Sequence, residues 1–471
     1  MSSKITPKCF FSDTPPERII GTECEYNLQQ GKYSNGKTIN IDAYISAQAI
    51  TKAKLNRSDV SHKFLNNGGG LYPEVGQLLE YDSPECLGPR EAAAADIAGS
   101  LIVADIVEKS GLPHKGLYRI SGSDISKVHD SETSGYHENY LIPRCISDSH
   151  LIDAVLPAYA ASCIWGFSGM VRSSYVFSQK VWDINDSPIE RKLERRTGHH
   201  KPMFIIPPIN ADIDTIGPKE WARVERRYAD SGLSPEVRYL QFASMSLVLR
   251  MIEHKDKIDH KRLARLALVD PVDAAKVFAS DLTLKSKASK ISGGKIRALE
   301  IQKELISIAY SLDEKVKLPD DESMAIGLWE DVVEQFGRCD PANVDYGNLI
   351  TKLDVAARHK VLANSLVGPG RITNTNKAAV SNSLVWDRVL PTGGAQLWWQ
   401  KFQSSIVPNE LIMAMKEGRH LPRTRAAIRI KELRRDYSSN HRISTIGWSF
   451  IHYGNGSSSY HRSLDDLYAT S

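Results

Sequence analysis

Hydrophobic and polar positions along the chain follow the periods of both helices and strands, so the sequence predicts a mixed α and β protein. Apolar residues recur at helical spacing over residues 87–109, where Pro89 stands near the expected start of the helix. Helical periodicity also dominates residues 236–253 and 297–335. The segment 18–28 alternates between apolar and polar residues, as a half-buried strand does.

Two later segments indicate how the chain is divided. A Lys- and Ser-rich connector over residues 285–294 is typical of a flexible link. Residues 405–471 are expected to form a small C-terminal domain, with a basic helix over Thr424–Arg435 and a strand over Ile443–Tyr453. We therefore expect a large domain over residues 1–404 that carries this small one.

Composition and charge exclude several classes of protein. Of the 471 residues, 41% are hydrophobic and 25% are charged, as in folded globular proteins. The net charge of +4 is too small to indicate nucleic-acid binding, and the apolar runs are too short to span a membrane. The N-terminus lacks the apolar core of a signal peptide, and the six cysteines include no Cys-x-x-Cys pair. A cytoplasmic protein without a nucleic-acid or membrane partner is expected.

The first candidate site residues are two acids on the strand of residues 18–28. Glu23 and Glu25 lie two positions apart, so their carboxylates point to the same face of the strand. Like charges on one face repel each other and are best tolerated beside a cation or water. Taken alone, such a pair is more often an exposed surface feature.

A second stretch, residues 67–86, places four carboxylates and two tyrosines among turn residues. Pro73 is disfavoured in a central strand, so Tyr72 and Glu74 are expected at a sheet edge or a bend. Oxygen ligands of this kind suit a hard cation that also contacts phosphates. A single acid of this stretch would more often be a solvated surface residue.

A third cluster spans residues 134–142. If this segment forms a strand, His137 and Asn139 face one way, whereas Glu138 and Tyr140 face the other. A lone histidine is usually structural, but beside an acid it can serve as a metal ligand or a general base.

Signatures of other nucleotide and nucleophile sites are missing from the sequence. It contains neither a Gly-x-x-x-x-Gly-Lys-Ser/Thr loop nor a Gly-x-Gly-x-x-Gly fingerprint, and Gly68–Gly70 alone is a weak signal. It also lacks the His-Glu-x-x-His and Gly-x-Ser-x-Gly motifs. What remains is an acidic, oxygen-rich site, which favours Mg²⁺ with a nucleotide or a phosphorylated substrate.

Three of these stretches resemble one known family in their order and spacing. They are Gly21–Tyr26, residues 67–86 and His137–Leu141. The family is that of the Pup ligases and depupylases, a branch of the glutamine synthetase-like carboxylate–amine ligases. Weaker collinear matches, such as Pro422–Ala426 and Gly447–Trp448, extend the resemblance over most of the chain.

The resemblance implies a fold, an activity and cofactors. The implied fold is α+β, with a curved antiparallel sheet that forms a cradle backed by helices, and a small C-terminal domain. Members of the family form or break an amide bond between a substrate lysine and the C-terminal side-chain carboxyl of a small, disordered protein modifier. They use ATP or ADP together with Mg²⁺.

The resemblance also implies roles for individual residues. The positions that match the family's functional residues are Glu74 for catalysis, Glu23, Tyr72 and Glu80 for Mg²⁺, and Ser83 and Trp448 for ATP. Arg425 lies on a basic helix that sits near the site in the family, so it is a further candidate for contacting the nucleotide. Glu25 and His137 are additional candidates for the site.

Three positions depart from the family's pattern. Glu74 stands where the family has a catalytic Asp, Gly70 where it has a phosphate-binding Arg, and Glu225 where an Arg-Leu-His element has its histidine. Because phosphoryl transfer needs positive charge around the transferred group, these changes would harm a ligase more than a hydrolase. In contrast, the short interval between Glu23 and Asn67 leaves no room for the extra loop typical of depupylases, and in this respect the sequence resembles the ligases.

The first reading of these features is a depupylase-like amide or peptide hydrolase that acts near the C-terminus of a small Pup- or ubiquitin-like protein and keeps Mg-nucleotide as a cofactor. The alternative is an ATP-dependent ligase that joins such a modifier to substrate lysines. A third reading is a catalytically inactive scaffold that binds the modifier or ATP, and a fourth is small-molecule carboxylate–amine ligation. In the first three readings the expected partner is the small modifier protein.

Overall fold

The structure is a computed structural model, and every structural statement below concerns the part of the chain that it describes. This part comprises residues 5–32, 34–39, 44, 63–74, 78–119, 135–146, 148–166, 170–171, 175–176, 203–206, 220–226, 232, 234–340, 347–351, 353–364, 377–401, 403–438, 443–446, 448, 450–454, 459–464 and 466–468.

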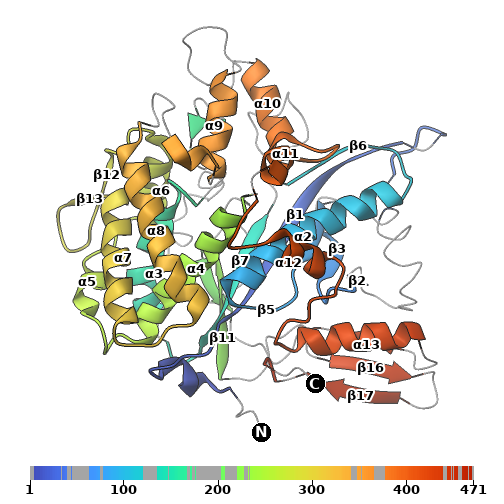
Figure 1. Cartoon of the computed structure of the whole chain (residues 1–471), viewed down its shortest axis with the longest axis horizontal. Helices are drawn as coiled ribbons and strands as arrows, with labels where there is room; N and C mark the ends of the chain where they lie inside the picture. Colours follow the sequence, from blue (N-terminus) through green and yellow to red (C-terminus); the bar gives the residue numbers. More distant parts are fainter. Residues whose placement is uncertain are drawn as a thin grey trace.

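An antiparallel sheet forms the centre of the fold (Figure 1). Its main path runs in the order β10-β11-β7-β1-β4-β3-β2, while β5 and β6 pair with β1, and β14 pairs with β6. The ten described strands of this sheet are β1 (Ile19–Gln30), β2 (Lys63–Phe64), β3 (Gly70–Glu74), β4 (Leu78–Asp82), β5 (Cys86–Leu87), β6 (His114–Tyr118), β7 (Tyr136–Pro143), β10 (Met203–Ile206), β11 (Trp221–Arg226) and β14 (Arg388–Leu390). The mixed α and β architecture with an antiparallel sheet is thus confirmed.

Strand β1 crosses the middle of this sheet and has two different faces. Alternate residues from Ile20 to Leu28 are buried, and the residues between them are half buried. The buried face meets helix α2 (Gly88–Lys109), where the hydroxyls of Tyr26 and Ser100 lie 3.1 Å apart. The other face carries Glu23 and Glu25, as the alternation of residues 18–28 predicts.

Helices cover the buried face of the sheet. Helix α4 (Pro235–Glu253) contacts both α2 and β7, and it is itself surrounded by α3, α7 and α8 in the helical group on the left of Figure 1. The other described helices are η1 (Pro7–Phe11), α3 (Asp148–Ser162), α5 (His260–Ala264), α6 (Pro271–Ser280), α7 (Ala298–Asp313), α8 (Asp320–Arg338), η5 (Gly347–Thr351), α9 (Asp354–Asn364), α10 (Lys377–Asp387), α11 (Gly394–Lys401) and α12 (Asn409–Lys416).

Helix α2 packs closely on the sheet because its inner side is made of very small residues. Ala92–Ala95 and Gly99 are buried. A Cβ atom added at Gly99 would lie 2.2 Å from the Tyr81 ring of β4, so this glycine sets how near the helix approaches. The predicted helix over residues 87–109 is confirmed, and its start is stabilised by the Glu91 carboxylate, which accepts from the backbone N–H of Leu87 at 2.8 Å.

The C-terminal part forms a small three-stranded sheet against one helix. Helix α13 (Ala426–Ser438) is followed by β15 (Ile443–Ile446), β16 (Phe450–Gly454) and β17 (Ser459–Ser463), which pair antiparallel in this order. The strand expected over Ile443–Tyr453 is therefore two strands. This unit shares a separate hydrophobic cluster with Phe64 of β2, whereas α12 packs on α2. The division into domains at residues 404 and 405 stays a prediction.

Two other expectations from the pattern need correction. The connector over residues 285–294 contributes to a hairpin of β12 (Lys287–Ser289) and β13 (Lys295–Arg297), with Gly293 and Gly294 at φ of 90° and 74° in the turn. The helical region 297–335 is two helices, α7 and α8, because the chain turns before Pro319. A further two-stranded hairpin consists of β8 (Met170–Val171) and β9 (Tyr175–Val176).

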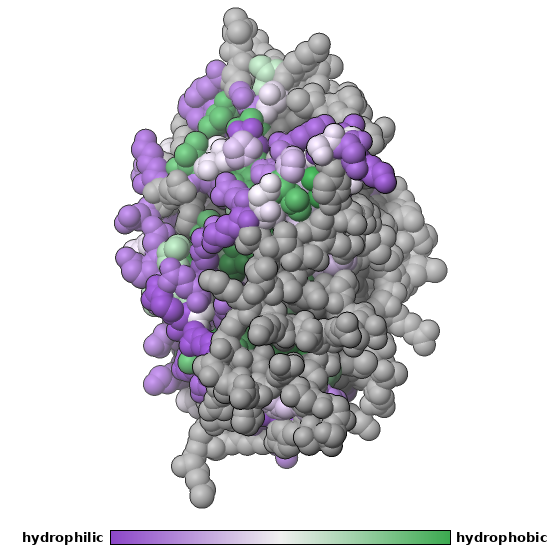
Figure 2. All heavy atoms as spheres, turned by 90° about the vertical axis from the view of Figure 1, so that its right-hand side faces the viewer, coloured by the Kyte–Doolittle hydropathy of each residue, from purple (hydrophilic) through white to green (hydrophobic). Residues whose placement is uncertain are grey.

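The described residues on one face of the molecule are mainly polar. Figure 2 shows hydrophilic side chains over most of the coloured area, with small separate hydrophobic patches. Among the described helices, none combines the length and the hydropathy that crossing a membrane requires.

Candidate functional site

The register of the central sheet aligns acidic residues from three strands. On one row across the sheet, Glu23 of β1 pairs with Asp82 of β4. On the next row, Glu25 pairs with Glu80, and Glu80 pairs with Tyr72 of β3. Because directly paired residues project from the same face of a sheet, this register collects the acids on the face opposite to α2.

The three residues predicted to bind Mg²⁺ are therefore close together. Tyr72 and Glu80 share a side-chain hydrogen bond, and the charge of Glu23 reaches both. Burial and the neighbouring charges of Asp82 and Glu23 raise the pKa of Glu80 well above its usual value. Burial and the same acids also raise the pKa of Tyr72. Such crowding of buried and half-buried oxygen ligands is relieved by a divalent cation.

Glu23 is also held from the other side by strands β7 and β11. His137 Nδ1 lies 2.8 Å from Glu23 Oε2, and Asn139 Nδ2 donates to Glu23 Oε1 at 3.1 Å. Arg223 Nη1 donates to the same oxygen at 3.3 Å. These contacts confirm that His137 and Asn139 share a face, while Glu138 is buried behind the sheet, 3.0 Å from Arg226.

A second possible cation position lies beside the first. Ligand atoms of Glu23, His137 and Glu225 all lie within 4.8 Å of one another. One imidazole nitrogen and two carboxylates form a donor set that suits Mg²⁺, Mn²⁺ or Zn²⁺. Glu23 stands between the two groups, so it is the residue that both positions would share.

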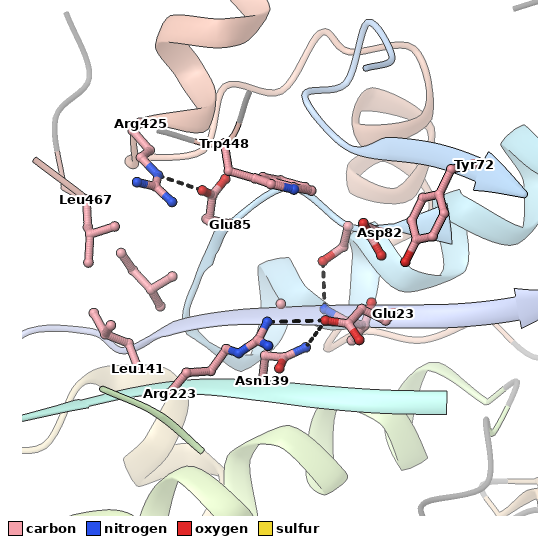
Figure 3. Close-up of a pocket in the computed structure, with 14 residues that line it drawn as sticks. Glu23, Tyr72, Asp82, Glu85, Asn139, Leu141, Arg223, Arg425, Trp448 and Leu467 are labelled. Carbon is pink, nitrogen blue, oxygen red and sulfur yellow. Dashed lines mark hydrogen bonds and ion pairs between the residues drawn. The ribbon is translucent and has the colours of Figure 1, made fainter. Parts of the chain in front are cut away.

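A cavity of about 390 Å³ opens next to these acids (Figure 3). Its lining residues come from widely separated parts of the chain and are Ile19, Gly21, Thr22, Glu23, Tyr72, Asp82, Ser83, Glu85, Asn139, Leu141, Arg223, Arg425, Trp448 and Leu467. In Figure 3, Glu23, Asp82 and Tyr72 lie at one end, whereas Leu141 and Leu467 lie at the other. The cavity is therefore acidic at one end and apolar at the other.

The three residues predicted to contact the nucleotide all line this cavity. The Ser83 hydroxyl accepts from the backbone N–H of Thr22 at 2.9 Å and donates to the carbonyl of Pro84 at 3.0 Å. Trp448 lies beside the cavity with its ring 4.9 Å from the Phe64 ring, edge to face. Arg425 is almost fully buried and donates to Glu85 at 2.7 Å.

The remaining predicted residues lie in different situations. Glu25 shares the face of Glu23, and its carboxylate accepts from the backbone N–H of Gly135. Glu74 ends strand β3, where its backbone pairs with Leu78, two residues beyond Tyr72. The Glu74 side chain lies outside the described part of the structure, so its catalytic role stays a prediction.

Nine of the fourteen lining residues were not among the predicted site residues, and Asp82, Arg223 and Leu467 are three of these nine. Asp82 follows Glu80 at strand spacing, and this alternation is a signal that could have identified it. Arg223 and Leu467 are far from Glu23 along the chain and reach it only through the sheet order β11-β7-β1 and the return of the C-terminal segment. Periodicity along the sequence carries no signal for them.

Comparison with known proteins gives the family. The family model described as "Pup-ligase protein" matches residues 18–452. The Pup–protein ligase of Acidimicrobium ferrooxidans is 25% identical over 366 residues, which cover 73% of this chain and 75% of that relative. The Pup–protein ligase of Kocuria rhizophila is 24% identical over 443 residues, which cover 88% and 87%.

Solved structures show the same fold. A Pup ligase in complex with the prokaryotic ubiquitin-like protein Pup superposes with a TM-score of 0.77 at 18% identity, covering 97% of this chain and 90% of that one. A Pup ligase in complex with ADP gives a TM-score of 0.72 at 18% identity and covers 88% of each chain.

These comparisons confirm the resemblance recognised from the sequence, and they rank its two main readings differently. Both relatives carry the name of a ligase, so the comparisons favour the ligase over the hydrolase that the altered residues suggested. The family model spans most of the chain and includes every residue that lines the cavity except Leu467. The chain belongs to the Pup ligase family.

Proposed function

We propose that this protein is an ATP-dependent ligase that joins the C-terminal carboxylate of a small Pup-like protein to lysine side chains. The observation that carries the proposal is the cavity with one acidic and one apolar end, in a member of the Pup ligase family. A phosphorylated carboxylate is the reactive species that an amine can attack, so such a ligase must hold a triphosphate and a carboxylate together.

The apolar end of the cavity suits the nucleobase. Ile19, Leu141 and Leu467 supply aliphatic walls, and Trp448, whose ring lies between Glu85 and Asp82 in Figure 3, offers an aromatic face beside them. Stacking on an aromatic ring recognises any base and contributes about 1–3 kcal/mol. The volume of about 390 Å³ is within the usual size of a small-molecule site.

The acidic end suits Mg²⁺ bound to phosphates. Glu23, Tyr72 and Glu80 would hold one ion, and Glu23, His137 and Glu225 could hold another. Bound there, Mg²⁺ would supply the positive charge that neutralises the phosphate oxygens. The raised pKa of Glu80 supports this assignment, because burial and neighbouring acids disfavour its charged form unless a cation compensates.

Arg223 supplies positive charge between the two ends. Its guanidinium lines the cavity 3.3 Å from Glu23 and is 29% exposed, so it can contact a phosphate while remaining anchored to the sheet. In the family that the sequence resembles, a phosphate-binding Arg stands at the position of Gly70. Arg223 stands at the arginine of the family's Arg-Leu-His element, so we assign to it the positive charge that remains in a site where Gly70 supplies none.

The hydrolase remains the second candidate because of a specific observation. Gly70 is buried in β3 opposite Asp82. The resemblance expects an arginine at position 70, so here the residue opposite Asp82 on β3 carries no positive charge. A less positive phosphate region favours chemistry in which nucleotide and metal stay bound while water attacks an amide, with Glu74 as the activating carboxylate.

One assay separates these functions. The purified protein is incubated with ATP, Mg²⁺, a lysine-containing acceptor protein and Pup variants that end in Glu or Gln, and both ADP and protein masses are followed. A ligase gives stoichiometric ADP and a mass gain on the acceptor. A hydrolase gives a shortened or deamidated modifier without ADP turnover. Bound nucleotide without either product would overturn both and leave the scaffold.

A further inference from the structure

A single carboxylate, that of Glu85, joins the C-terminal segment to the cavity. Arg425 Nε donates to Glu85 Oε1 at 2.7 Å, and Arg429 donates to both oxygens of the same carboxylate. The Thr424 hydroxyl also donates to the backbone carbonyl of Glu85 at 2.7 Å. Glu85 lies in the short connection between β4 and β5, so it links the acidic strands to the start of α13 (Figure 3).

Arg429 connects Glu85 to Trp448. Its Nη1 donates to the backbone carbonyl of Trp448 at 2.9 Å, and its guanidinium lies 4.8 Å from the centre of the Trp448 ring. The Phe64 ring is 5.5 Å from the same guanidinium. Both the backbone and the ring of Trp448 are therefore held by one arginine that is itself held by Glu85.

The pairing is strong because both arginines are buried. Arg425 is 3% exposed and Arg429 is fully buried, so each guanidinium needs an anion to compensate for the loss of water. Burial would raise the pKa of Glu85, but the charges of Arg429 and Arg425 outweigh it and hold this pKa at about 2. Without the carboxylate, two buried positive charges would repel each other and move toward solvent.

We propose that Glu85 is a positioning residue that holds Trp448, through Arg429, as the aromatic wall of the cavity on which the nucleobase stacks. The inference rests on the nucleotide site proposed above and extends it to a residue that does not touch the reacting atoms. Because the Arg425 guanidinium already pairs with Glu85, we assign to Arg425 the role of orienting the C-terminal segment, and not that of binding a phosphate.

The same segment contains a matched control. Arg423 forms an ion pair with Glu17, but this pair is 66% and 26% exposed and lines a separate cavity of about 860 Å³. Glu17→Gln, like Glu85→Gln, removes a carboxylate that pairs with an arginine of the C-terminal segment. Glu17 has no described contact with Trp448. Exposed ion pairs contribute little, so the affinity for a nucleotide should stay within about threefold of that of the wild type.

The test compares the binding of ADP and adenosine in the presence of Mg²⁺, by calorimetry, for the wild type, Glu85→Gln, Glu17→Gln, Trp448→Ala and the double variant Glu85→Gln/Trp448→Ala. Glu85→Gln should weaken both ligands by the same factor of roughly ten, because a stacked base is lost in each case. In the Trp448→Ala background, Glu85→Gln should cause no further loss, since the two residues act through one contact.

Three results would overturn the inference. Tighter ADP binding with unchanged adenosine binding would mean that Glu85 acts by its charge on Arg425. Additive losses in the double variant, or no loss in Glu85→Gln, would show that Glu85 does not act through Trp448. If Glu85→Gln does not fold, Arg429→Lys tests the same link, because it keeps the charge but loses the fork to Glu85 and Trp448. A wild type that binds neither ligand would overturn the proposed nucleotide site itself.

Discussion

Glu80 occupies the most crowded position of the acidic cluster, and this makes its contribution to stability depend on a cation. Burial and the charges of Asp82 and Glu23 raise its pKa well above the usual value of 4.5. A carboxyl group with a raised pKa in the folded state favours folding at low pH and disfavours it as pH rises through that pKa. At neutral pH without a cation, Glu80 therefore destabilises the fold.

Glu80→Gln is expected to stabilise the protein in EDTA at pH 7, by on the order of 1 kcal/mol. It should also abolish the additional stability that Mg²⁺ gives to the wild type, because an amide neither repels its acidic neighbours nor binds the ion strongly. Urea unfolding with EDTA or Mg²⁺ measures both effects. Glu108→Gln, an exposed position on α2, serves as the control. A Glu80→Gln variant that is less stable in EDTA and is still stabilised by Mg²⁺ would contradict the claim that Glu80 helps to bind a cation.

Glu74 is the position where the resemblance places the catalytic carboxylate. Glu74→Gln should lower turnover by roughly 10²–10⁴-fold, as the loss of a general base does, and should leave ADP affinity unchanged. Glu74→Asp restores the residue expected from the family and should keep activity. The rate of product formation and calorimetric ADP binding check these two expectations. Full activity in Glu74→Gln would remove this residue from the chemistry.

Individual site residues could be predicted from the sequence where they occupy alternate positions of a strand. Glu23, Tyr72 and Glu80 come together because neighbouring strands pair in register, and alternation with the family resemblance was sufficient to select them. Arg223 could not be selected in this way, because its contact with Glu23 depends on the order of strands in the sheet. The ion pairs of Glu85 with Arg425 and Arg429 could not be predicted either, because they depend on how α13 packs against the sheet.

Among the elements, α2 depends on a glycine for its distance from the sheet. A Cβ atom at position 99 would overlap the Tyr81 ring, so Gly99→Ala should destabilise the protein by about 1–3 kcal/mol. The same substitution at Gly327, on the exposed side of α8, should stabilise it by roughly 0.5–1 kcal/mol, since alanine favours helices and nothing there clashes.

Urea unfolding of both alanine variants measures this difference in sign. Equal effects at Gly99 and Gly327 would show that helix propensity, rather than the approach of α2 to β4, determines the outcome.

Long elements were predicted better than short ones. The helices over 87–109 and 236–253 have many turns of apolar spacing and were found nearly as expected. The hairpin after residue 286 was missed because each of its strands buries a single apolar side chain, Ala288 or Ile296, which is too short a pattern to recognise.

For the whole molecule, a buried network of charges joins the beginning of the sheet to two helices. Arg18, next to β1, forms a two-pronged pair with Glu253 of α4 at 2.9 Å for each hydrogen bond. Arg250 of α4 bonds Glu253 at 3.1 Å and Glu322 of α8 at 2.8 Å. Removing one partner leaves a buried charge uncompensated.

Glu322→Gln should therefore cost roughly 3–5 kcal/mol at pH 7. Burial would raise the pKa of Glu322, but Arg250 outweighs it and holds this pKa below its usual value of 4.5. A lowered pKa of an acid gives stability that is present above about pH 4.5 and is lost as pH falls further. The difference between wild type and variant should shrink below this pH in urea titrations. A difference that is independent of pH would contradict the assignment.

The central claim is that the acidic residues of β1, β3 and β4 hold a cation that orients a nucleotide in the adjoining cavity. The most direct measurement is calorimetric titration of ADP into the wild type and Glu23→Gln, each with Mg²⁺ and with EDTA. We predict that the wild type binds ADP with Mg²⁺, that EDTA weakens this binding strongly, and that Glu23→Gln removes the effect of Mg²⁺. ADP binding of equal strength in all four titrations, or none in any, would contradict the account.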